Sequence, residues 1–321
     1  MKALVYTRYG GPEVLQLKEI ERPVPKDDEV LVKVHAVSLN DWDWALLSGD
    51  TFVIRLMNGL AKPKRTILGS DIAGRVEAVG KSVTQIRRGD EVFGDLSGIW
   101  GGLAEYACAK EKMLTLKPAS MSFVDAAAIP QAAMLAVQGL LDVGKIRQGQ
   151  NILINGAGGG VGTFGVQLAK LYGAEVTGVD RTEKMEMMRS LGFDHVLDYK
   201  TTDFTRAGQR YDLILDTKTN RSVFNYPRVL NPNGVYVTVG GDMDRLFQAL
   251  VLGPLISWIR KKHIRIVALK PNKDLAYMKE LFEAGKVKPV IDGPYRLEEA
   301  SDAFRIFGRG EHKGKIVITL V

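Results

Sequence analysis

The sequence predicts an α/β protein that combines a doubly wound parallel sheet with a separate, mainly-β domain. Two observations lead to this prediction. Within residues 1–121, short apolar runs alternate with turns rich in Pro, Gly and Asp, which is typical of strands in a compact β domain. From residue 122 the pattern changes to strands that alternate with helix-length stretches, and such alternation favours parallel pairing.

The expected strands can be placed individually from their apolar runs. In the first domain they are 2–6, 30–39, 72–80 and 90–96. In the parallel sheet they are 151–155, 175–180, 195–199, 211–217, 234–240 and 264–269. The remaining C-terminal residues contain two expected helices and a terminal strand at 314–321, which could rejoin the first domain. The predicted organisation is therefore 1–121, 122–270 and 271–321.

The composition is that of a globular protein with enough apolar residues for a large core, since 45% of the 321 residues are hydrophobic and 25% are charged. The net charge of +7 is dispersed among 37 acidic residues, so we expect no nucleic-acid binding. The single cysteine, Cys108, excludes an internal disulfide framework, which suits a reducing compartment, and we expect a cytoplasmic location. The N-terminus reads as a strand and a turn rather than a secretion signal.

A glycine-rich segment, GAGGGVG, lies between the buried strand 151–155 and a helix-length stretch. A dinucleotide is bound in this context, because glycines let the backbone approach the pyrophosphate and the N–H groups of the helix start hold its charge. The alternative is an ordinary strand-to-helix turn. The candidate cofactor-binding residues of the loop are Gly156, Gly158, Gly159, Gly160, Val161 and Gly162.

The residues at and just after the end of the next strand favour different cofactors. Asp180 ends strand 175–180, where a carboxylate could bond the ribose hydroxyls of NAD and reject a 2′-phosphate. The same carboxylate could instead cap a helix that begins at Arg181. Arg181 and Lys184 follow directly, and either could neutralise the 2′-phosphate of NADP. On these residues alone, NAD(H) and NADP(H) are equally open.

The sequence resembles the medium-chain dehydrogenase/reductase superfamily, and within it the zinc-free, quinone oxidoreductase-like branch. The similarity runs nearly from end to end, through EVLVKVHAVSLNDWDW, LGSDIAGRVEAVG, GGLAEYA, GAGGGVGTFGVQLAK, AGKVKPVID and GKIVITLV. This resemblance implies a GroES-like catalytic domain closed by the C-terminal segment, a Rossmann nucleotide domain and a homodimer.

The resemblance also implies roles for single residues. The segment Gly159 to Gly162 would form the pyrophosphate loop. Lys184 lies where many members place a lysine against the 2′-phosphate, which favours NADP(H) and leaves NAD(H) possible. Two further matches concern other parts of the cofactor: the tyrosine that borders the adenosine corresponds to Tyr199, and the segment beneath the nicotinamide to Gly240 and Gly241.

The positions that hold catalytic zinc in other members of the superfamily carry different residues in this sequence. Their cysteine would fall within Ser38–Asn40 and their histidine within Gly69–Asp71. The four histidines of the chain have no ligand spacing either. We therefore expect no metal. Without a Lewis acid the substrate must already be activated, as quinones and α,β-unsaturated carbonyls are.

Groups that could act on such a substrate lie in the stretch SLNDWDW, which the resemblance places facing the nicotinamide. Asn40 could donate an amide N–H to a carbonyl oxygen, and Trp44 could form an aromatic wall with one N–H donor. Asp43 is a third candidate for the catalytic site, although it could equally be an Asx-turn or helix-start residue. The proton of the reaction could come from solvent.

We interpret the protein as a zinc-independent, NAD(P)H-dependent reductase of quinones or α,β-unsaturated carbonyls. An NAD(P)-dependent alcohol or aldehyde dehydrogenase is the alternative enzyme. A non-catalytic, nucleotide-binding redox sensor or scaffold is the alternative from another class of protein.

Two further stretches are unusual. Residues 51–65, TFVIRLMNGLAKPKR, are expected to form a long loop at the edge of the substrate site. Residues 245–263 are a continuous apolar run that ends in three basic residues, and such a segment could touch a membrane through Trp258. The resemblance instead implies a cap over the active site or a contact between subunits, so membrane contact is not expected.

Overall fold

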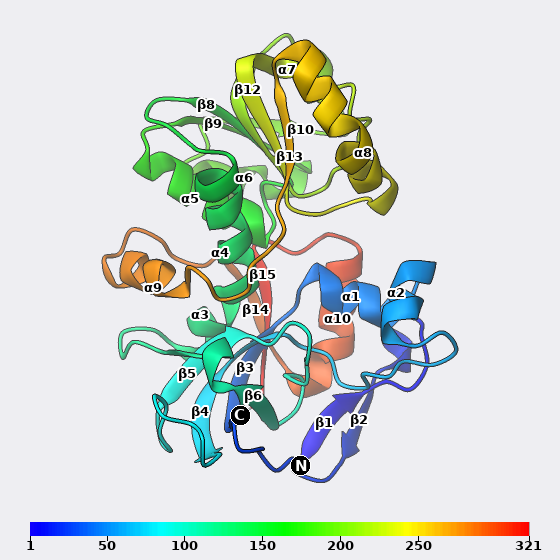
Figure 1. The fold of residues 1–321 in the computed structure, drawn as a ribbon, viewed down its shortest axis with the longest axis vertical. Helices are drawn as coiled ribbons and strands as arrows, with labels where there is room; N and C mark the ends of the chain where they lie inside the picture. The colour runs from blue at the N-terminus through cyan, green and yellow to red at the C-terminus, as the bar shows by residue number, and fades with distance from the viewer. Residues whose placement is uncertain (321) are drawn as a thin grey trace. The chain divides into compact units, whose positions relative to one another are not determined.

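The computed structural model describes residues 1–320, and the chain divides into two compact units (Figure 1). One unit contains residues 1–131 together with the C-terminal segment from Pro271, and the other contains residues 132–270. The first division falls after residue 131 rather than after 121, because helix α3 (Phe123–Ala128) packs on strands β3 (Glu29–Ser38) and β4 (Asp71–Val79). Val321, the end of the predicted terminal strand, lies outside the described residues.

The first unit is built around β3, which is apolar on both faces because it lies inside a sheet of the order β14-β15-β3-β4-β5-β7, with β6 also paired to it. A separate hairpin joins β1 and β2. The other strands of this unit are β1 (Lys2–Val5), β2 (Gln16–Glu19), β5 (Glu91–Asp95), β6 (Tyr106–Lys110), β7 (Thr115–Leu116), β14 (Ile291–Arg296) and β15 (Lys315–Thr319).

The last strand, β15, ties the C-terminal segment to the first unit. It pairs antiparallel with β3, with Val317 opposite Ser38, and parallel with β14. This register brings Lys315, the first residue of β15, beside the turn that follows β3. The other helices of the unit are α1 (Asp41–Ser48), α2 (Phe52–Asn58), α9 (Leu275–Glu283) and α10 (Ala300–Gly308), with single 3-10 turns at Pro12–Val14, Glu111–Met113 and Leu297–Glu299.

The stretch 51–65, predicted as a loop, begins instead with the short helix α2, so that prediction is wrong for its first half. Thr51 is the N-cap, and its hydroxyl accepts a hydrogen bond from the N–H of Ile54 at 3.3 Å. Gly59, with a φ of +114°, ends the helix. The cap and the glycine together mark a helix that is too short to show a clear apolar period in the sequence.

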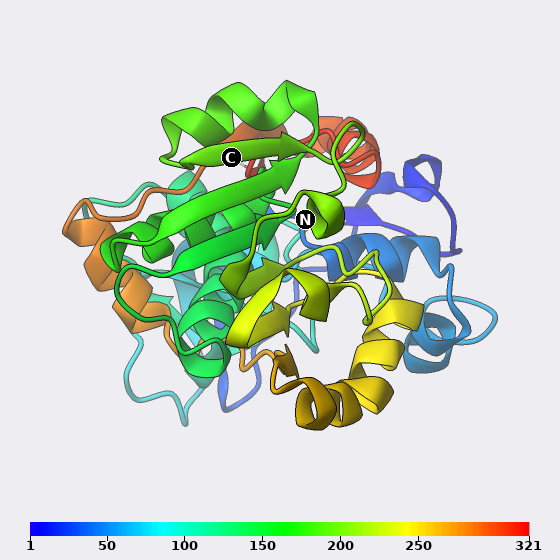
Figure 2. The ribbon, with the colours of Figure 1, turned by 90° about the horizontal axis from the view of Figure 1, so that it is seen from above.

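The second unit is a parallel sheet of the order β10-β9-β8-β11-β12-β13, as the alternation of strands and helices predicted. Figure 2 looks down on these strands and shows helices on both sides of the sheet, with α7 and α8 on the same side. The strands are β8 (Asn151–Asn155), β9 (Glu175–Asp180), β10 (His195–Asp198), β11 (Tyr211–Asp216), β12 (Leu230–Thr238) and β13 (His263–Ile266). The helices are α4 (Pro130–Val137), which runs on as a π-helical turn to Val143, α5 (Gly160–Leu171), α6 (Met185–Ser190), α7 (Tyr226–Val229) and α8 (Met243–Arg260), with 3-10 turns at Thr182–Lys184 and Phe204–Arg206.

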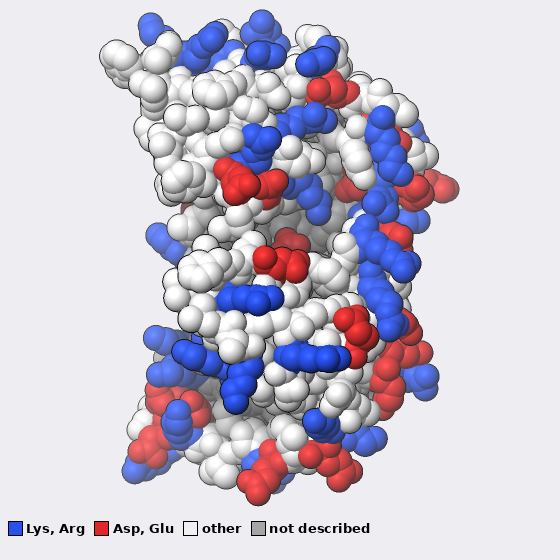
Figure 3. All heavy atoms as spheres, turned by 90° about the vertical axis from the view of Figure 1, so that its right-hand side faces the viewer, with Lys and Arg blue, Asp and Glu red and all other residues white. Residues whose placement is uncertain are grey.

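Helix α8 contains most of the apolar segment 245–263, and it has apolar side chains on both its inner and its outer side. Its inner side buries Ala249, Gly253 and Ile256 against the sheet. Its outer side exposes Phe247 and Trp258, of which Trp258 is 81% exposed. Figure 3 shows Lys and Arg side chains along the upper edge of this face, with a white, largely uncharged area at the upper left. Among residues 1–320, no helix is long and apolar enough to cross a membrane.

Candidate active site

The glycine loop of the second unit joins β8 to α5, and two of its glycines are required by the fold itself. Gly156 has a φ of +81°, and a Cβ there would lie 2.0 Å from Thr217 Oγ1. At Gly162 a Cβ would lie 2.4 Å from the carbonyl oxygen of Ala157, a backbone atom that cannot easily move aside. These two glycines let the loop fold back against the first turn of α5.

Gly159 is different, because the protein leaves room for a side chain at this position. Its φ is −90°, and the nearest heavy atom to a Cβ placed there is the carbonyl oxygen of Gly156 at 3.5 Å. Gly159 directly precedes α5, where the first backbone N–H groups of a helix have no acceptor within the helix. A phosphate is the ligand that such a helix start binds, and a side chain at Gly159 would take its place.

Asp180 ends β9 and turns its carboxylate toward the glycine loop. Its Oδ2 accepts the N–H of Gly158 at 2.9 Å, and its Oδ1 accepts the N–H of Arg181 at 2.9 Å. The helical turn that follows begins at Thr182 and has Arg181 as its N-cap residue. The interpretation of Asp180 as a helix cap is therefore wrong, because β9 continues through Asp180 and the chain turns only afterwards.

Three cationic side chains lie near Asp180 and the glycine loop. The Lys184 side chain is 4% exposed, its Nζ lies 3.7 Å from Asp180 Oδ1, and burial lowers the pKa of its ammonium. Arg181 hydrogen-bonds with Tyr199, whose side chain is half-exposed. Lys218 also packs against the loop, and sequence reasoning missed it because only the parallel sheet brings the end of β11 beside the end of β8.

The two glycines after β12 differ in the room that the protein leaves around them. Gly241 has a φ of +121°, and a Cβ there would lie 2.0 Å from the carbonyl oxygen of Lys218. Gly240 has no heavy atom within 4 Å of its Cβ position, and its carbonyl oxygen accepts hydrogen bonds from the hydroxyls of Thr219 and Thr238. Gly241 is therefore required by the fold, whereas Gly240 leaves open space beside the backbone.

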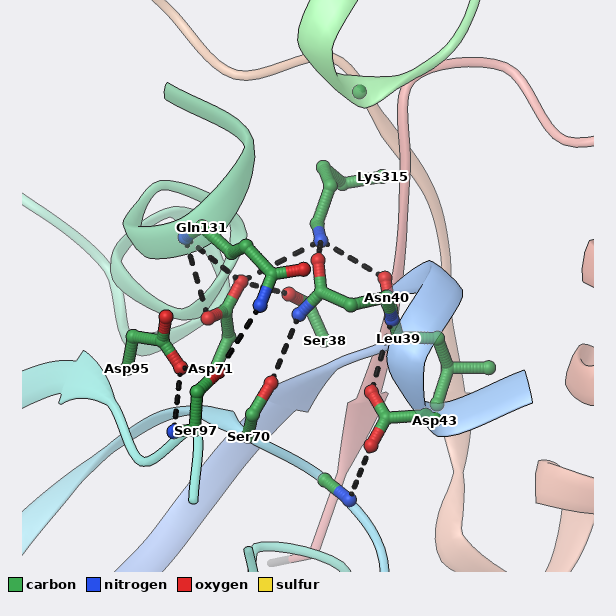
Figure 4. A network of polar contacts seen from close by, with 12 residues as sticks. Ser38, Leu39, Asn40, Asp43, Ser70, Asp71, Asp95, Ser97, Gln131 and Lys315 are labelled. Atoms are coloured by element: carbon green, nitrogen blue, oxygen red, sulfur yellow. Dashed lines mark hydrogen bonds and ion pairs between the residues drawn. The ribbon is translucent and has the colours of Figure 1, made fainter. Parts of the chain in front are cut away.

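In the first unit, polar side chains meet where β3 ends and α1 begins (Figure 4). Asp43 is fully buried, and its carboxylate accepts the N–H of Asn40 at 3.0 Å and the N–H of Gly69 at 2.8 Å. Burial disfavours its charged form and raises the pKa of Asp43 to about 7. Asp43 thus fastens the segment before β4 to the turn that carries Asn40, as a helix-start residue does.

Lys315 is the residue of this network that sequence reasoning missed. Its Nζ lies 2.6 Å from Asn40 Oδ1, 2.8 Å from the carbonyl oxygen of Leu39 and 3.5 Å from Asp71 Oδ2 (Figure 4). The lysine and Asp71 are 244 positions apart in the chain, and only the pairing of β15 with β3 brings them together. The motif GKIVITLV had suggested a terminal strand but gave no sign that its lysine is buried.

Two buried carboxylates, Asp71 and Asp95, lie opposite each other on β4 and β5. Asp71 accepts the backbone N–H of Gln131 at 3.2 Å and the hydroxyl of Ser38 at 3.3 Å. Asp95 Oδ1 accepts both donors of Ser97, while its Oδ2 has no partner among the described residues. Burial first, and the neighbouring Asp95 as well, raise the pKa of Asp71 to about 7 against the opposing pull of Lys315.

Trp44 is half-buried within the core of the first unit rather than fully exposed. A Cβ at Gly308 of α10 would lie 2.2 Å from Cη2 of the Trp44 ring, so the ring lies directly against that helix. The absence of a side chain at Gly308 makes this contact possible. The ring edge is thus positioned by α10, a contact that the sequence did not indicate.

The segments that hold zinc in other members of the superfamily, Ser38–Asn40 and Gly69–Asp71, lie side by side, but their side chains do not suit a metal. Asn40 Nδ2 donates to Ser70 Oγ at 3.2 Å, and the ammonium of Lys315 already takes the acceptor oxygens of Asn40 and Asp71. A second cation there would be repelled by this ammonium. No group of three or more His, Cys, Asp or Glu side chains in residues 1–320 could hold a metal ion.

Comparisons with known proteins agree with this architecture. Residues 26–119 match the family described as alcohol dehydrogenase GroES-like domain, and residues 191–318 match the family described as zinc-binding dehydrogenase. The chain is 33% identical to the chloroplast envelope quinone oxidoreductase homolog of Arabidopsis thaliana, over 99% of this chain and 98% of that protein. It is 33% identical to the NADPH-dependent alkenal/one oxidoreductase of the same plant, over 99% of this chain and 79% of that protein.

A solved structure gives the same result for the fold. The quinone oxidoreductase from Coxiella burnetii has a TM-score of 0.86 and 27% identity, and the match covers 100% of this chain and 99% of that one.

Proposed function

Since the chain belongs to the medium-chain dehydrogenase/reductase superfamily, in its quinone oxidoreductase-like branch, we propose that it is an NAD(P)H-dependent, zinc-independent reductase of quinones or α,β-unsaturated carbonyls. Two features carry this proposal: the backbone at Gly159 leaves room for a phosphate, and the ammonium of Lys315 binds oxygens of Asn40 and Asp71, in the segments where other members hold zinc. The first feature suits a dinucleotide, and the second suits a substrate that needs no Lewis acid.

The second unit has the residues that would hold the cofactor, whose reduced nicotinamide supplies the hydride. The helix start at α5 would hold the pyrophosphate, and the open backbone at Gly240 leaves room for a flat ring. The half-exposed Tyr199 would border the adenosine. These assignments are proposals that the geometry supports.

We propose that NADP(H) is the preferred cofactor. Both carboxylate oxygens of Asp180 already accept backbone N–H groups, so this side chain is engaged in holding the loop. The cations Arg181, Lys184 and Lys218 outnumber it, and an excess of positive charge favours a 2′-phosphate over a ribose hydroxyl.

On the substrate side, the first unit would stabilise the negative charge that develops on the substrate oxygen when the hydride arrives. We assign this donor role to the amide of Asn40, which is 6% exposed. Asp43 holds the backbone of Asn40 in place and is a positioning residue rather than a proton donor in this proposal. The proton would come from solvent.

The experiment that tests the proposal is a panel of quinones and enones, supplied with NADPH or NADH, in parallel with simple alcohols and the oxidised cofactors. We expect turnover of quinones or enones and none of simple alcohols, because no Lewis acid polarises the alcohol. In Lys184→Ala, affinity for NADPH should fall roughly ten- to a hundredfold and that for NADH should change little. Turnover of alcohols alone would favour an alcohol dehydrogenase, and nucleotide binding without any turnover would favour a sensor or scaffold.

We also propose that the protein is a homodimer. The outer face of α8 exposes large apolar side chains, including Phe247, Val251 and Trp258, and a second copy of the chain would remove them from water.

A reducing, cytoplasmic location suits the single cysteine, Cys108, whose pKa is raised to about 11 by burial.

A further inference from the structure

The ammonium of Lys315 is buried and fully hydrogen-bonded inside the first unit. Its side chain is 4% exposed, and it has three acceptors: the carbonyl oxygen of Leu39, Asn40 Oδ1 and Asp71 Oδ2. An ammonium has three N–H donors and no acceptor, so each of its protons has a place among these atoms (Figure 4).

The contact with Lys315 decides which way the Asn40 amide is turned. Because an ammonium can only donate, the Asn40 atom at 2.6 Å must be the oxygen, and the nitrogen then faces Ser70 Oγ at 3.2 Å. The amide nitrogen has two protons. Ser70 Oγ accepts one of them, and the carboxylate of Asp71 also accepts from this amide, so a substrate oxygen would have to replace one of these two acceptors.

The distances indicate that Lys315 binds the amide of Asn40 more closely than it binds the carboxylate of Asp71. Its shortest contact is with the amide of Asn40, whereas Asp71 is 3.5 Å away and is also held by Ser38 and Gln131. A buried ion pair adds little to stability compared with apolar side chains of the same size. Stability alone therefore does not account for a charged side chain at this position.

The charge of Lys315 also acts on the amide electronically. A cation at the amide oxygen draws electron density from the nitrogen, and in a buried, low-dielectric position this makes the amide N–H groups stronger donors. The network is thus suited to an oxygen that becomes negatively charged during a reaction.

We propose that Lys315 is a positioning residue for the reduction, which orients the Asn40 amide and strengthens its donation to the substrate oxygen. This inference rests on the proposed function, because the oxygen is that of the quinone or enone. The hydride that would leave the C4–H bond of the reduced nicotinamide forms a new C–H bond at the substrate carbon, the electron pair of the conjugated π bond moves to this oxygen, and solvent supplies the proton; the substrate is reduced and the nicotinamide oxidised.

The test uses Lys315→Met together with Asp71→Asn, so that no buried charge is left unpaired. For an enone, kcat should fall about ten- to a hundredfold, which is below the loss of about 10²- to 10³-fold expected when an oxyanion donor is removed outright. The KM for NADPH should not change. Quinone turnover should fall less than threefold, because the ring itself delocalises the developing charge.

The chain contains a closely matched control in Lys117. Its side chain is also 4% exposed in the first unit, and its Nζ contacts one carboxylate, Glu91 at 2.8 Å, and the carbonyl oxygens of Pro118 and Met121. Lys117→Met with Glu91→Gln removes a buried lysine and its partly exposed partner, which also pairs with Arg75, without touching Asn40, so kcat should remain at the parent value. Equal losses in the two double variants, or equal losses for enone and quinone in the Lys315 variant, would overturn the proposal.

A second readout does not depend on activity. In the ¹⁵N-labelled protein without cofactor, the side-chain NH₂ signals of Asn40, assigned by their loss in Asn40→Ala, should shift in the Lys315 double variant relative to Asp71→Asn alone and stay in place in the Lys117 variant. Unchanged Asn40 signals would contradict the orienting role of Lys315. A parent enzyme that reduces neither substrate class would instead refute the proposed function and leave this second result interpretable.

Discussion

Single residues show most clearly what burial does to chemistry in this protein. Asp43 is fully buried and accepts two backbone N–H groups, and its pKa is raised to about 7 because burial disfavours the charge. The sequence indicated both a helix-start role and a place in the catalytic site for Asp43, and the geometry supports the structural role. Its burial could not be read from SLNDWDW, since Asp41 and Asp43 look alike there and only Asp41 is exposed.

A pH dependence of stability follows from these carboxyls. The pKa values of Asp43 and Asp71 are raised in the folded protein, so between about pH 4 and pH 7 the folded state binds more protons than the unfolded state. The free energy of unfolding should therefore fall as the pH rises through this range and level off above it. Urea unfolding of the parent and of Asp43→Asn at several pH values measures this slope, with the exposed Asp41→Asn as control. A parental slope in Asp43→Asn would show that this carboxyl does not titrate in the folded state.

At the scale of elements, strand β8 and the loop from it to a helix were predicted, because glycines, apolar strand and helix follow one another locally. The helix α2 and the network around Lys315 were not predicted. The first is too short to show a period, and the second joins β15 to β3 across almost the whole chain. Local patterns thus predicted the glycine loop of the second unit better than the polar network of the first unit.

Two glycines of this loop should respond in opposite ways to a side chain. Gly159→Val should fold normally, because 3.5 Å separates its Cβ from the nearest protein atom, and should lose NADPH binding. Gly162→Ala should lower the melting temperature, because its Cβ would lie 2.4 Å from the backbone of Ala157. Thermal unfolding and calorimetric titration of both variants separate the two effects. Full NADPH affinity in a folded Gly159→Val would place the pyrophosphate elsewhere.

At the scale of the whole molecule, the outer side of α8 exposes large apolar side chains, as the shorter helix α2 also does. The sequence showed an apolar run in α8 but not which side of the helix would face outward.

Because Trp258 is 81% exposed and opposite the buried side of the helix, Trp258→Asp should convert a dimer into a monomer. Light scattering after gel filtration measures this mass. Phe52→Asp, on the exposed side of α2, is the control and should remain dimeric. A monomeric parent would contradict the dimer.

The most direct measurement of the central claim is the position of deuterium in the product after reduction of an enone with NADPH that carries deuterium at both C4 positions, so that transfer from either face is seen. Conjugate reduction without a Lewis acid predicts one deuterium at the β-carbon of a saturated carbonyl product, with the α-proton derived from solvent. Deuterium at the carbonyl carbon of an allylic alcohol, or no transfer of deuterium at all, would contradict the account.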